Sequence, residues 1–170
     1  ALDSVIEVAI ALVGFSGIVA AVGRRGAGHW SPVDQLLLRV LLTGAGAALA
    51  FAFLPFLLID VIDPSLVWRV CSGVHAAFVF GILLYRFREV SVLGVTEALG
   101  KHNLAVMFVA ASTVFMVSVS NALWFASSSL YVLAIVWHVV TAFWTFVALL
   151  LDAARQPPDA TPPPPDNSPG

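Results

Sequence analysis

Five long apolar segments constrain this chain more than any other feature. They cover residues 4–23, 35–59, 65–86, 104–124 and 129–151. The hydrocarbon core of a bilayer is about 30 Å thick, so about 20 apolar residues in a helix are needed to cross it. The chain is 60% hydrophobic and 11% charged, with a mean hydropathy of +0.97, which is too little polar surface for a water-soluble globule. We therefore predict an all-α polytopic membrane protein, a bundle of five transmembrane helices.

The basic residues near the segment ends predict the orientation of this bundle. With five spans, they all fall on one side of the membrane, which the positive-inside rule makes the cytoplasmic side. The N-terminus is then outside, and a four-span arrangement is the poorer interpretation because it divides the basic residues between two sides. The first segment begins with Asp3 and Glu7 rather than with basic residues, so we interpret it as a span and not as a signal peptide. The basic residues are Arg24, Arg25, Arg86, Arg88, Lys101 and Arg155.

Composition divides the chain into two parts. Residues 1–152 form the transmembrane helical domain, and residues 153–170 form a proline-rich tail that holds seven of the ten prolines. Such a segment cannot pack a core and favours polyproline II conformation, so we expect a disordered cytoplasmic tail. The alternative is that the tail binds a protein partner.

Small residues recur at helical spacing in the first two spans. Small residues four apart allow helix backbones to approach closely in lipid. One interpretation is packing within the chain, of the first two helices against each other, and the other is a seam between copies of the chain in a homo-oligomer. The residues are Gly14, Gly17 and Ala21 in the first span, and Gly44, Ala48 and Ala52 in the second.

A polar cluster is expected near the outer membrane surface. Glu7 and Arg69 each lie about four residues from the outer end of a span, so they could form an ion pair at equal depth. Ser118 and Asn121, at the outer end of the fourth span, reach a similar level. Ionisable groups within spans often mark function, so the cluster is either a structural ion pair or a vestibule for a solute or ion.

Two histidines are expected near the membrane midplane. His75 lies ten residues after Ser65, and His138 lies ten residues after Ser128, on helices that run parallel in the five-span topology. Neutral imidazoles that hydrogen-bond Ser72, Thr141 or backbone carbonyls between helices are the simplest interpretation.

Ligand binding by the same histidines is the alternative. Facing imidazoles on two helices could ligate haem b axially, and Cys71, one turn before His75, makes a soft metal site conceivable. No carboxylate accompanies the pair as a further support for a metal, so we predict no metal site and no cofactor, with haem b as the alternative. A quinone or another apolar ligand against Trp137 and Trp144 is a third possibility.

Other functional classes have little support in the sequence. The net charge of −2 argues against nucleic-acid binding, and the single cysteine excludes an intrachain disulfide. The chain contains no P-loop, CxxCH, HExxH or GxSxG motif. An enzymatic role is therefore left open but unsupported, and no catalytic residue is assigned.

Two stretches of the chain resemble a known family. The run EVAIALVGFSGIVAAVGRR is followed by a W-x-x-x-D-x-x-x-x-R pattern of Trp30, Asp34 and Arg39. A late W-H-x-x-x-x-F element contains Trp137, His138 and Phe143. Together they are similar to a family of small uncharacterised bacterial integral-membrane proteins. The resemblance implies a location in the bacterial inner membrane and supplies no activity.

From these features we expect a small multi-pass inner-membrane protein that self-associates and conducts or transports a small solute or ion. Two alternatives remain. The first is a haem-binding or redox membrane subunit that uses His75 and His138, and the second is a non-catalytic accessory subunit of a larger membrane complex. The transported species, the oligomer number and the partner of the tail are not encoded in any recognisable motif.

Overall fold

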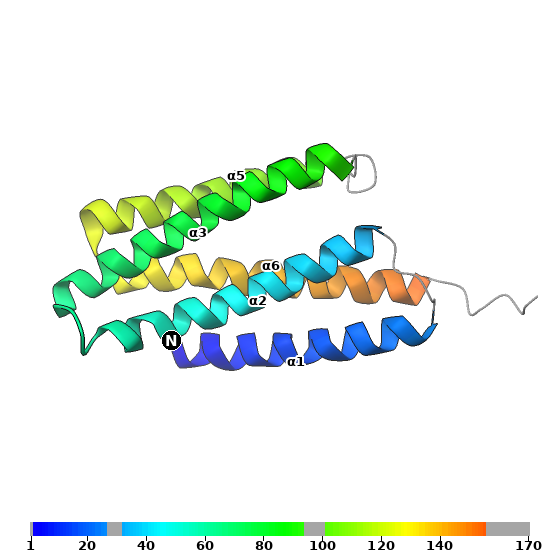
Figure 1. The fold of residues 1–170 in the computed structure, drawn as a ribbon, viewed down its shortest axis with the longest axis horizontal. Helices are drawn as coiled ribbons and strands as arrows, with labels where there is room; N and C mark the ends of the chain where they lie inside the picture. The colour runs from blue at the N-terminus through cyan, green and yellow to red at the C-terminus, as the bar shows by residue number, and fades with distance from the viewer. Residues whose placement is uncertain (1, 27–31, 94–100, 156–170) are drawn as a thin grey trace, which may run out of the picture.

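The computed structural model describes residues 2–26, 32–93 and 101–155, and nearly all of them are helical (Figure 1). The described residues contain no β-strand, so the predicted all-α class is confirmed. The elements are α1 (Leu2–Gly26), α2 (Pro32–Leu58), α3 (Pro64–Leu93), α5 (Lys101–Ser120), the π-helical turn η1 (Asn121–Phe125) and α6 (Ser128–Arg155).

Four helical segments among the described residues are long and apolar enough to cross a membrane. They are Gln35–Leu58 of α2, Pro64–Arg88 of α3, Ala105–Phe125 of α5 with η1, and Ser128–Leu151 of α6. The helix α1 is formed over 25 residues but is not among these four segments, so the fifth span and the outside N-terminus stay predictions. Most of the proline-rich tail lies outside the described residues.

The helices form two groups that lie side by side. The helix α2 makes its most extensive contacts with α6 and α1, whereas α3 packs mainly against α5 and η1. Figure 1 shows α3 and α5 as a hairpin beside the group formed by α1, α2 and α6. Contacts between the hairpin and the three-helix group are fewer, so each side chain that bridges them matters for their relative position.

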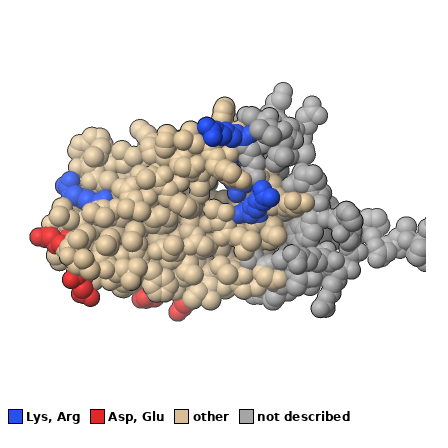
Figure 2. Space-filling view, viewed as in Figure 1, with Lys and Arg blue, Asp and Glu red and all other residues tan. Residues whose placement is uncertain are grey.

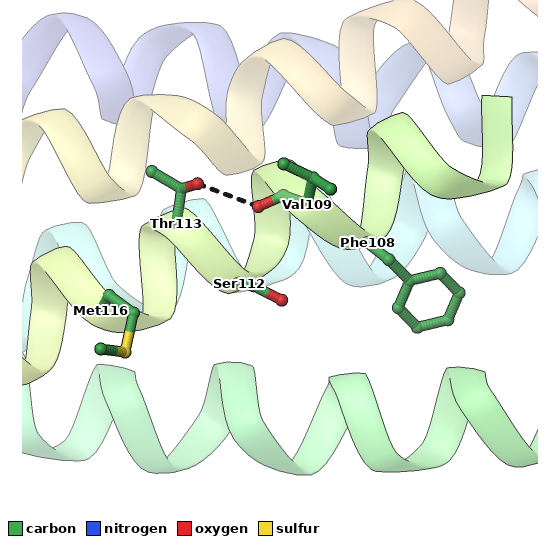
Figure 3. Close-up of a pocket in the computed structure, with 5 residues that line it drawn as sticks. All are labelled: Phe108, Val109, Ser112, Thr113 and Met116. Carbon is green, nitrogen blue, oxygen red and sulfur yellow. Dashed lines mark hydrogen bonds between the residues drawn. The ribbon is translucent and has the colours of Figure 1, made fainter. Parts of the chain in front are cut away.

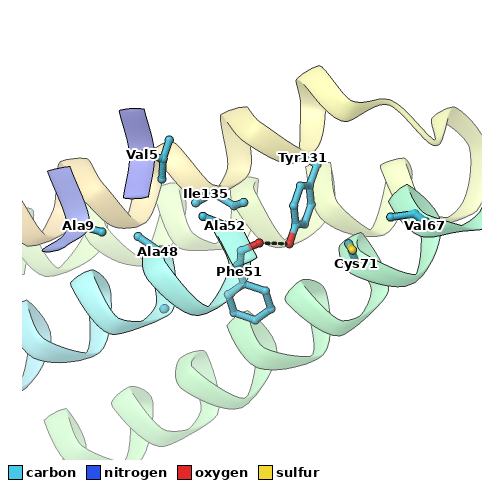
Figure 4. Close-up of a cluster of buried hydrophobic side chains, with 10 residues drawn as sticks. Val5, Ala9, Ala48, Phe51, Ala52, Val67, Cys71, Tyr131 and Ile135 are labelled. Carbon is cyan, nitrogen blue, oxygen red and sulfur yellow. Dashed lines mark hydrogen bonds between the residues drawn. The ribbon is translucent and has the colours of Figure 1, made fainter. Parts of the chain in front are cut away.

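The main apolar core lies where α1, α2, α3 and α6 meet (Figure 4). Small residues allow this meeting, because Ala9, Ala48 and Ala52 are completely buried and bring the helix backbones together. Tyr131 and Ile135 of α6 fill the remaining space and are also buried. The core therefore combines close backbone approach on α1 and α2 with large side chains from α6.

A proline in α2 leaves one backbone carbonyl without its helical partner. In an α-helix the carbonyl of Phe51 would accept the N–H of residue 55, but residue 55 is a proline and has no N–H. The hydroxyl of Tyr131 donates to this carbonyl instead, at 2.7 Å (Figure 4). A side chain of α6 thus satisfies a buried acceptor that the sequence of α2 cannot satisfy itself.

In Figure 2, acidic groups lie at the left end of the molecule and along its lower edge, basic groups lie at the left end and towards the right, and mostly uncharged residues cover the rest of the described surface. Asp3 and Glu7 begin α1, and this end of α1 lies beside the end of α2 that leads to Asp60 and Asp63 (Figure 1). Large apolar side chains such as Leu57, Trp124 and Trp144 are 67–75% exposed. Exposed apolar surface of this extent is typical of a lipid-facing surface.

The proline-compensating contact predicts a specific double-mutant cycle. Tyr131→Phe leaves the Phe51 carbonyl buried without a donor and should cost about 1–3 kcal/mol of stability. In a Pro55→Ala background the new N–H serves that carbonyl, so the same substitution should cost clearly less. Denaturation of the detergent-solubilised protein, followed by circular dichroism, measures both. Tyr85→Phe, at a 55% exposed tyrosine, is the control, and equal losses in the two backgrounds would contradict the assignment.

The start of α3 supplies a second prediction. Asp63 precedes Pro64, and its carboxylate accepts the backbone N–H of Ser65 at 2.8 Å, as an N-cap residue does. Hydrogen bonds from the Ser65 side chain and backbone lower the pKa of Asp63. The cap is therefore complete above the ordinary carboxyl pKa of about 3.9 and is lost as pH falls below it. Wild-type protein should lose stability relative to Asp63→Ala below about pH 4, and parallel pH profiles of the two proteins would refute this role.

Candidate functional site

Five buried polar side chains lie together where the α3–α5 hairpin meets α6. We call this set the polar layer, and it consists of Ser72 and His75 from α3, Ser118 from α5, Asn121 from η1 and His138 from α6. Each is at most 8% exposed, in a chain whose other buried residues are mostly apolar. Its members come from segments that are distant in sequence, so the layer exists only in the folded bundle.

The two imidazoles of the polar layer are in direct contact. Nε2 of His75 lies 2.9 Å from Nε2 of His138, and Nδ1 of His75 lies 2.9 Å from the hydroxyl of Ser118. The Ser118 hydroxyl donates to the carbonyl of Val114, one turn earlier on α5, at 2.8 Å. A continuous row of hydrogen bonds therefore runs from α6 through α3 to α5.

Aromatic rings enclose the histidine pair. Phe51 of α2 meets His75 edge-on, with the ring centroids 4.8 Å apart. The ring centroids of Phe78 and His138 are 6.0 Å apart. The ring centroids of Tyr131 and His75 are 6.3 Å apart. These rings place apolar surface around most of the pair, and His138 keeps 8% of its surface exposed.

A glycine on α2 sets the position of His138. A Cβ placed on Gly44 would lie 3.1 Å from the carbonyl oxygen of His138 and 3.3 Å from Cβ of Ala142. The backbones of α2 and α6 can therefore be this close only with glycine at residue 44. The contact falls on the backbone of the histidine itself, so Gly44 positions the imidazole.

Asn121 organises the turn between α5 and α6. Its amide donates to the Ser72 hydroxyl at 2.8 Å and to the carbonyl of Ser127, while its carbonyl oxygen accepts the Ser127 N–H at 2.7 Å. The chain bends here because η1 ends at Ala126, which has a left-handed backbone with φ 50°. The Asn121 side chain thus fixes a strained turn and ties it to α3.

The expected outer cluster is divided in the structure. Ser118 and Asn121 are buried in the polar layer, whereas Glu7 is exposed on α1. Arg69 donates from Nη1 to the carbonyl of Leu123 in η1, at 2.9 Å, and makes no ion pair with Glu7. Equal depth in the membrane does not bring Glu7 and Arg69 together, because depth does not fix the rotation of a helix about its axis. The helix α3 packs mainly on α5 and η1, not on α1.

The expected partners of the histidines also differ. The sequence predicts hydrogen bonds to Ser72, Thr141 or backbone carbonyls, but the histidines bond each other and Ser118. Ser72 accepts from the Asn121 amide, and the hydroxyl of Thr141 donates to the carbonyl of Trp137 on its own helix. The equal depth of His75 and His138 agrees with their contact. Cys71 faces the apolar core beside Val67 and Tyr131, and no group of three or more potential ligands that could hold a metal occurs among the described residues.

Axial ligation of haem does not fit the observed pair. A metal–imidazole bond is about 2.0–2.1 Å long, so two nitrogens on opposite sides of one ion lie about 4 Å apart. The observed separation of 2.9 Å leaves no space for iron between the two nitrogens, and Phe51 and Phe78 pack against the two rings. The sequence alternative based on haem therefore has no support in this geometry.

Two shallow grooves lie on the outside of α5, apart from the histidine pair. The first is lined by α5 alone, by Phe108, Val109, Ser112, Thr113 and Met116 (Figure 3). The Thr113 hydroxyl donates to the Val109 carbonyl, so it is already engaged. The second groove runs between α5 and α6 and includes Trp137, whereas Trp144 is 75% exposed and is not part of it. Both grooves are largely apolar, as expected of surface that faces lipid.

The small residues of the two expected faces have different roles. Gly44 and the buried Ala48 and Ala52 pack within the chain, Gly44 against α6. A Cβ on Gly14 or Gly17 would meet no atom of the described residues within 4 Å, so these glycines do not pack against the other described helices. The side chain of Ala21 is outside the described part of α1.

Sequence reasoning missed Tyr131 and Phe51. The signal for this contact was present, since Pro55 follows Phe51 by four residues and must free its carbonyl. What the sequence lacked was any indication of which polar side chain on another helix would reach that carbonyl.

In the part of the chain that the structure describes, fold and site together define a helical protein with four helices long and apolar enough to cross a membrane and a buried polar layer between them. Comparisons with models of protein families, with curated proteins and with solved structures give no match to this chain. The resemblance to small bacterial integral-membrane proteins therefore stays a prediction.

The close approach at Gly44 gives a test of the site. Gly44→Ala should push α6 away by a few tenths of an ångström and cost about 1–3 kcal/mol by overpacking. Gly46→Ala, on the same helix where a Cβ meets nothing within 4 Å, should be neutral or slightly stabilising. Thermal unfolding in detergent compares the two variants. Similar stability of both would show that α2 and α6 are not in contact at residue 44.

Proposed function

We propose that this chain is a multi-pass membrane protein that conducts or transports a small ion, with the polar layer as its intramembrane site. The observation that carries the proposal is the direct contact of two buried imidazoles, 2.9 Å apart, between helices that are long and apolar enough to cross a bilayer. Polar and ionisable side chains are costly in hydrocarbon, and those retained there commonly belong to ion pathways and proton relays.

The distribution of charge supports a defined orientation for this protein. Asp3 and Glu7 lie in the first turns of α1, and Asp60 and Asp63 lie between α2 and α3 at the same end of the bundle, whereas Arg86 and Arg88 lie near the far end of α3 (Figure 1). With the basic end in the cytoplasm, the N-terminus is outside, as the five-span arrangement requires. The resemblance to bacterial integral-membrane proteins supports the inner membrane as the location.

Self-association remains part of the proposal. Gly14 and Gly17 lie on a face of α1 where an added Cβ would meet none of the described residues, and small residues there permit close helix contact. Cross-linking in lipid should give a discrete oligomer, and recovery of monomer alone would contradict this part of the proposal without affecting the polar layer.

Ion flux into liposomes tests the proposed function. Purified protein in liposomes that contain dyes for H⁺, Na⁺, K⁺ or Cl⁻ should carry at least one of these ions faster than protein-free liposomes do. His75→Gln and His138→Gln should each remove most of this flux, because both rings belong to the site. Glu7→Gln, at an exposed position, is the matched control and should retain it.

Two results would contradict the proposal. One is the absence of flux of all four ions with correctly folded protein. The other is flux that survives loss of either histidine but falls in Glu7→Gln, which would return the pathway to the outer surface.

A further inference from the structure

We infer that the ion handled by this protein is the proton, and that the two imidazoles of the polar layer pass it directly from one ring to the other. The inference rests on the proposed function and names its ion. Two nitrogen atoms 2.9 Å apart can share a hydrogen atom but have no space between them for a metal cation or a water molecule. Hard cations also prefer oxygen ligands, which this contact does not provide.

The direction of each hydrogen bond follows from the fixed end of the row. The Ser118 hydroxyl gives its hydrogen to the Val114 carbonyl, so it must accept from Nδ1–H of His75. Nε2 of His75 is then a bare acceptor in the neutral ring, and Nε2–H of His138 donates to it. A single assignment of hydrogens satisfies every one of these contacts with both rings neutral.

This assignment leaves one nitrogen of the pair ready to accept a proton. Nδ1 of His138 carries no hydrogen and makes no hydrogen bond to the described residues. His138 keeps 8% of its surface exposed, whereas His75 is fully buried, so a proton enters the pair at His138. Entry and onward transfer therefore take place on different rings.

The transfer between the rings is balanced. A proton that binds Nδ1 of His138 makes this ring an imidazolium with hydrogens on both nitrogens. The Nε2–H bond of His138 then breaks as an N–H bond forms at Nε2 of His75, and the positive charge moves to His75. His138 becomes neutral again, now with its hydrogen on Nδ1. The charge has crossed from the three-helix group to the α3–α5 hairpin without an oxidant, a reductant or any other reactant.

The surroundings limit the pair to one extra proton. With both rings charged, two N–H groups would point at each other across 2.9 Å. Among the acidic residues whose side chains the structure describes, none is placed to balance a second charge, because Asp3, Glu7, Asp60 and Asp63 are all exposed. The titratable groups near the pair are Tyr131 on α6 and Cys71 on α3. The side chains that contact His75 from α2 and α5, Phe51 and Ser118, carry no charge. The turn η1 contributes Asn121, which is also uncharged and bonds Ser72 of α3.

Nitrogen NMR of the imidazoles tests this inference independently of transport. In a His29→Gln/His102→Gln variant labelled with ¹⁵N-histidine, the signals come from the pair alone. Near neutral pH we expect hydrogens on Nδ1 of His75 and Nε2 of His138, and a scalar coupling between the two Nε2 atoms across the hydrogen bond. On acidification the pair should take up one proton, and both rings should respond in the same step.

Ser118→Ala provides the matched perturbation. It removes the acceptor of Nδ1–H of His75, so the preference of His75 for that hydrogen position should be lost. Ser112→Ala, at an exposed serine on the same helix, should leave the spectrum unchanged. Unchanged His75 signals in Ser118→Ala would overturn the assignment.

The remaining outcomes separate this inference from the proposed function. Two rings that titrate independently without coupling would overturn the inference, and flux of Na⁺ or K⁺ in place of H⁺ would do the same while the proposed function stands. Coupled rings that bind one proton, in protein that carries no ion, would overturn the proposed function and leave a proton-binding pair.

Discussion

The hydrogen bond between Nε2 of His75 and Nε2 of His138 is the contact on which the rest of this bundle depends. It joins the α3–α5 hairpin to the group of α1, α2 and α6, at an interface that has few other contacts. In an apolar interior an imidazole without a partner would cost several times the net value of one hydrogen bond. The two groups of helices must therefore meet in the one arrangement that satisfies both rings.

The same constraint explains the other buried polar contacts. Tyr131 serves the carbonyl that Pro55 leaves free, and Asn121 closes the turn that a left-handed residue at Ala126 opens. The guanidinium of Arg69 donates to a carbonyl of η1, where a helix ends and its last carbonyls lack helical donors. No fully buried polar atom among the described side chains lacks a partner. In such a chain the polar residues specify the arrangement, because the apolar surfaces are nearly interchangeable.

This division of roles bears on function. If the row of hydrogen bonds only stabilised the fold, we would expect both of its ends to lie on backbone groups. Here the row ends on the Val114 carbonyl at one side and, at the other, on a nitrogen of His138 that has no hydrogen-bond partner among the described residues. This open end, on an imidazole nitrogen that is able to accept a proton, is the feature on which the proposed relay rests.

Several features were determined by the sequence itself. Segment lengths and composition predict the helices and their ability to cross a membrane, the Asp63-Pro64 pair marks the start of α3, and counting along the helices places His75 and His138 at equal depth. Which side chains meet was decided only by the tertiary structure. Ser118 was assigned to an outer cluster, and Arg69 to Glu7, because depth was known and rotation was not. A helix that is apolar on every side carries no periodic pattern to indicate the face it buries. That choice is made by close contacts such as Gly44 against His138, which exist only after the helices have packed.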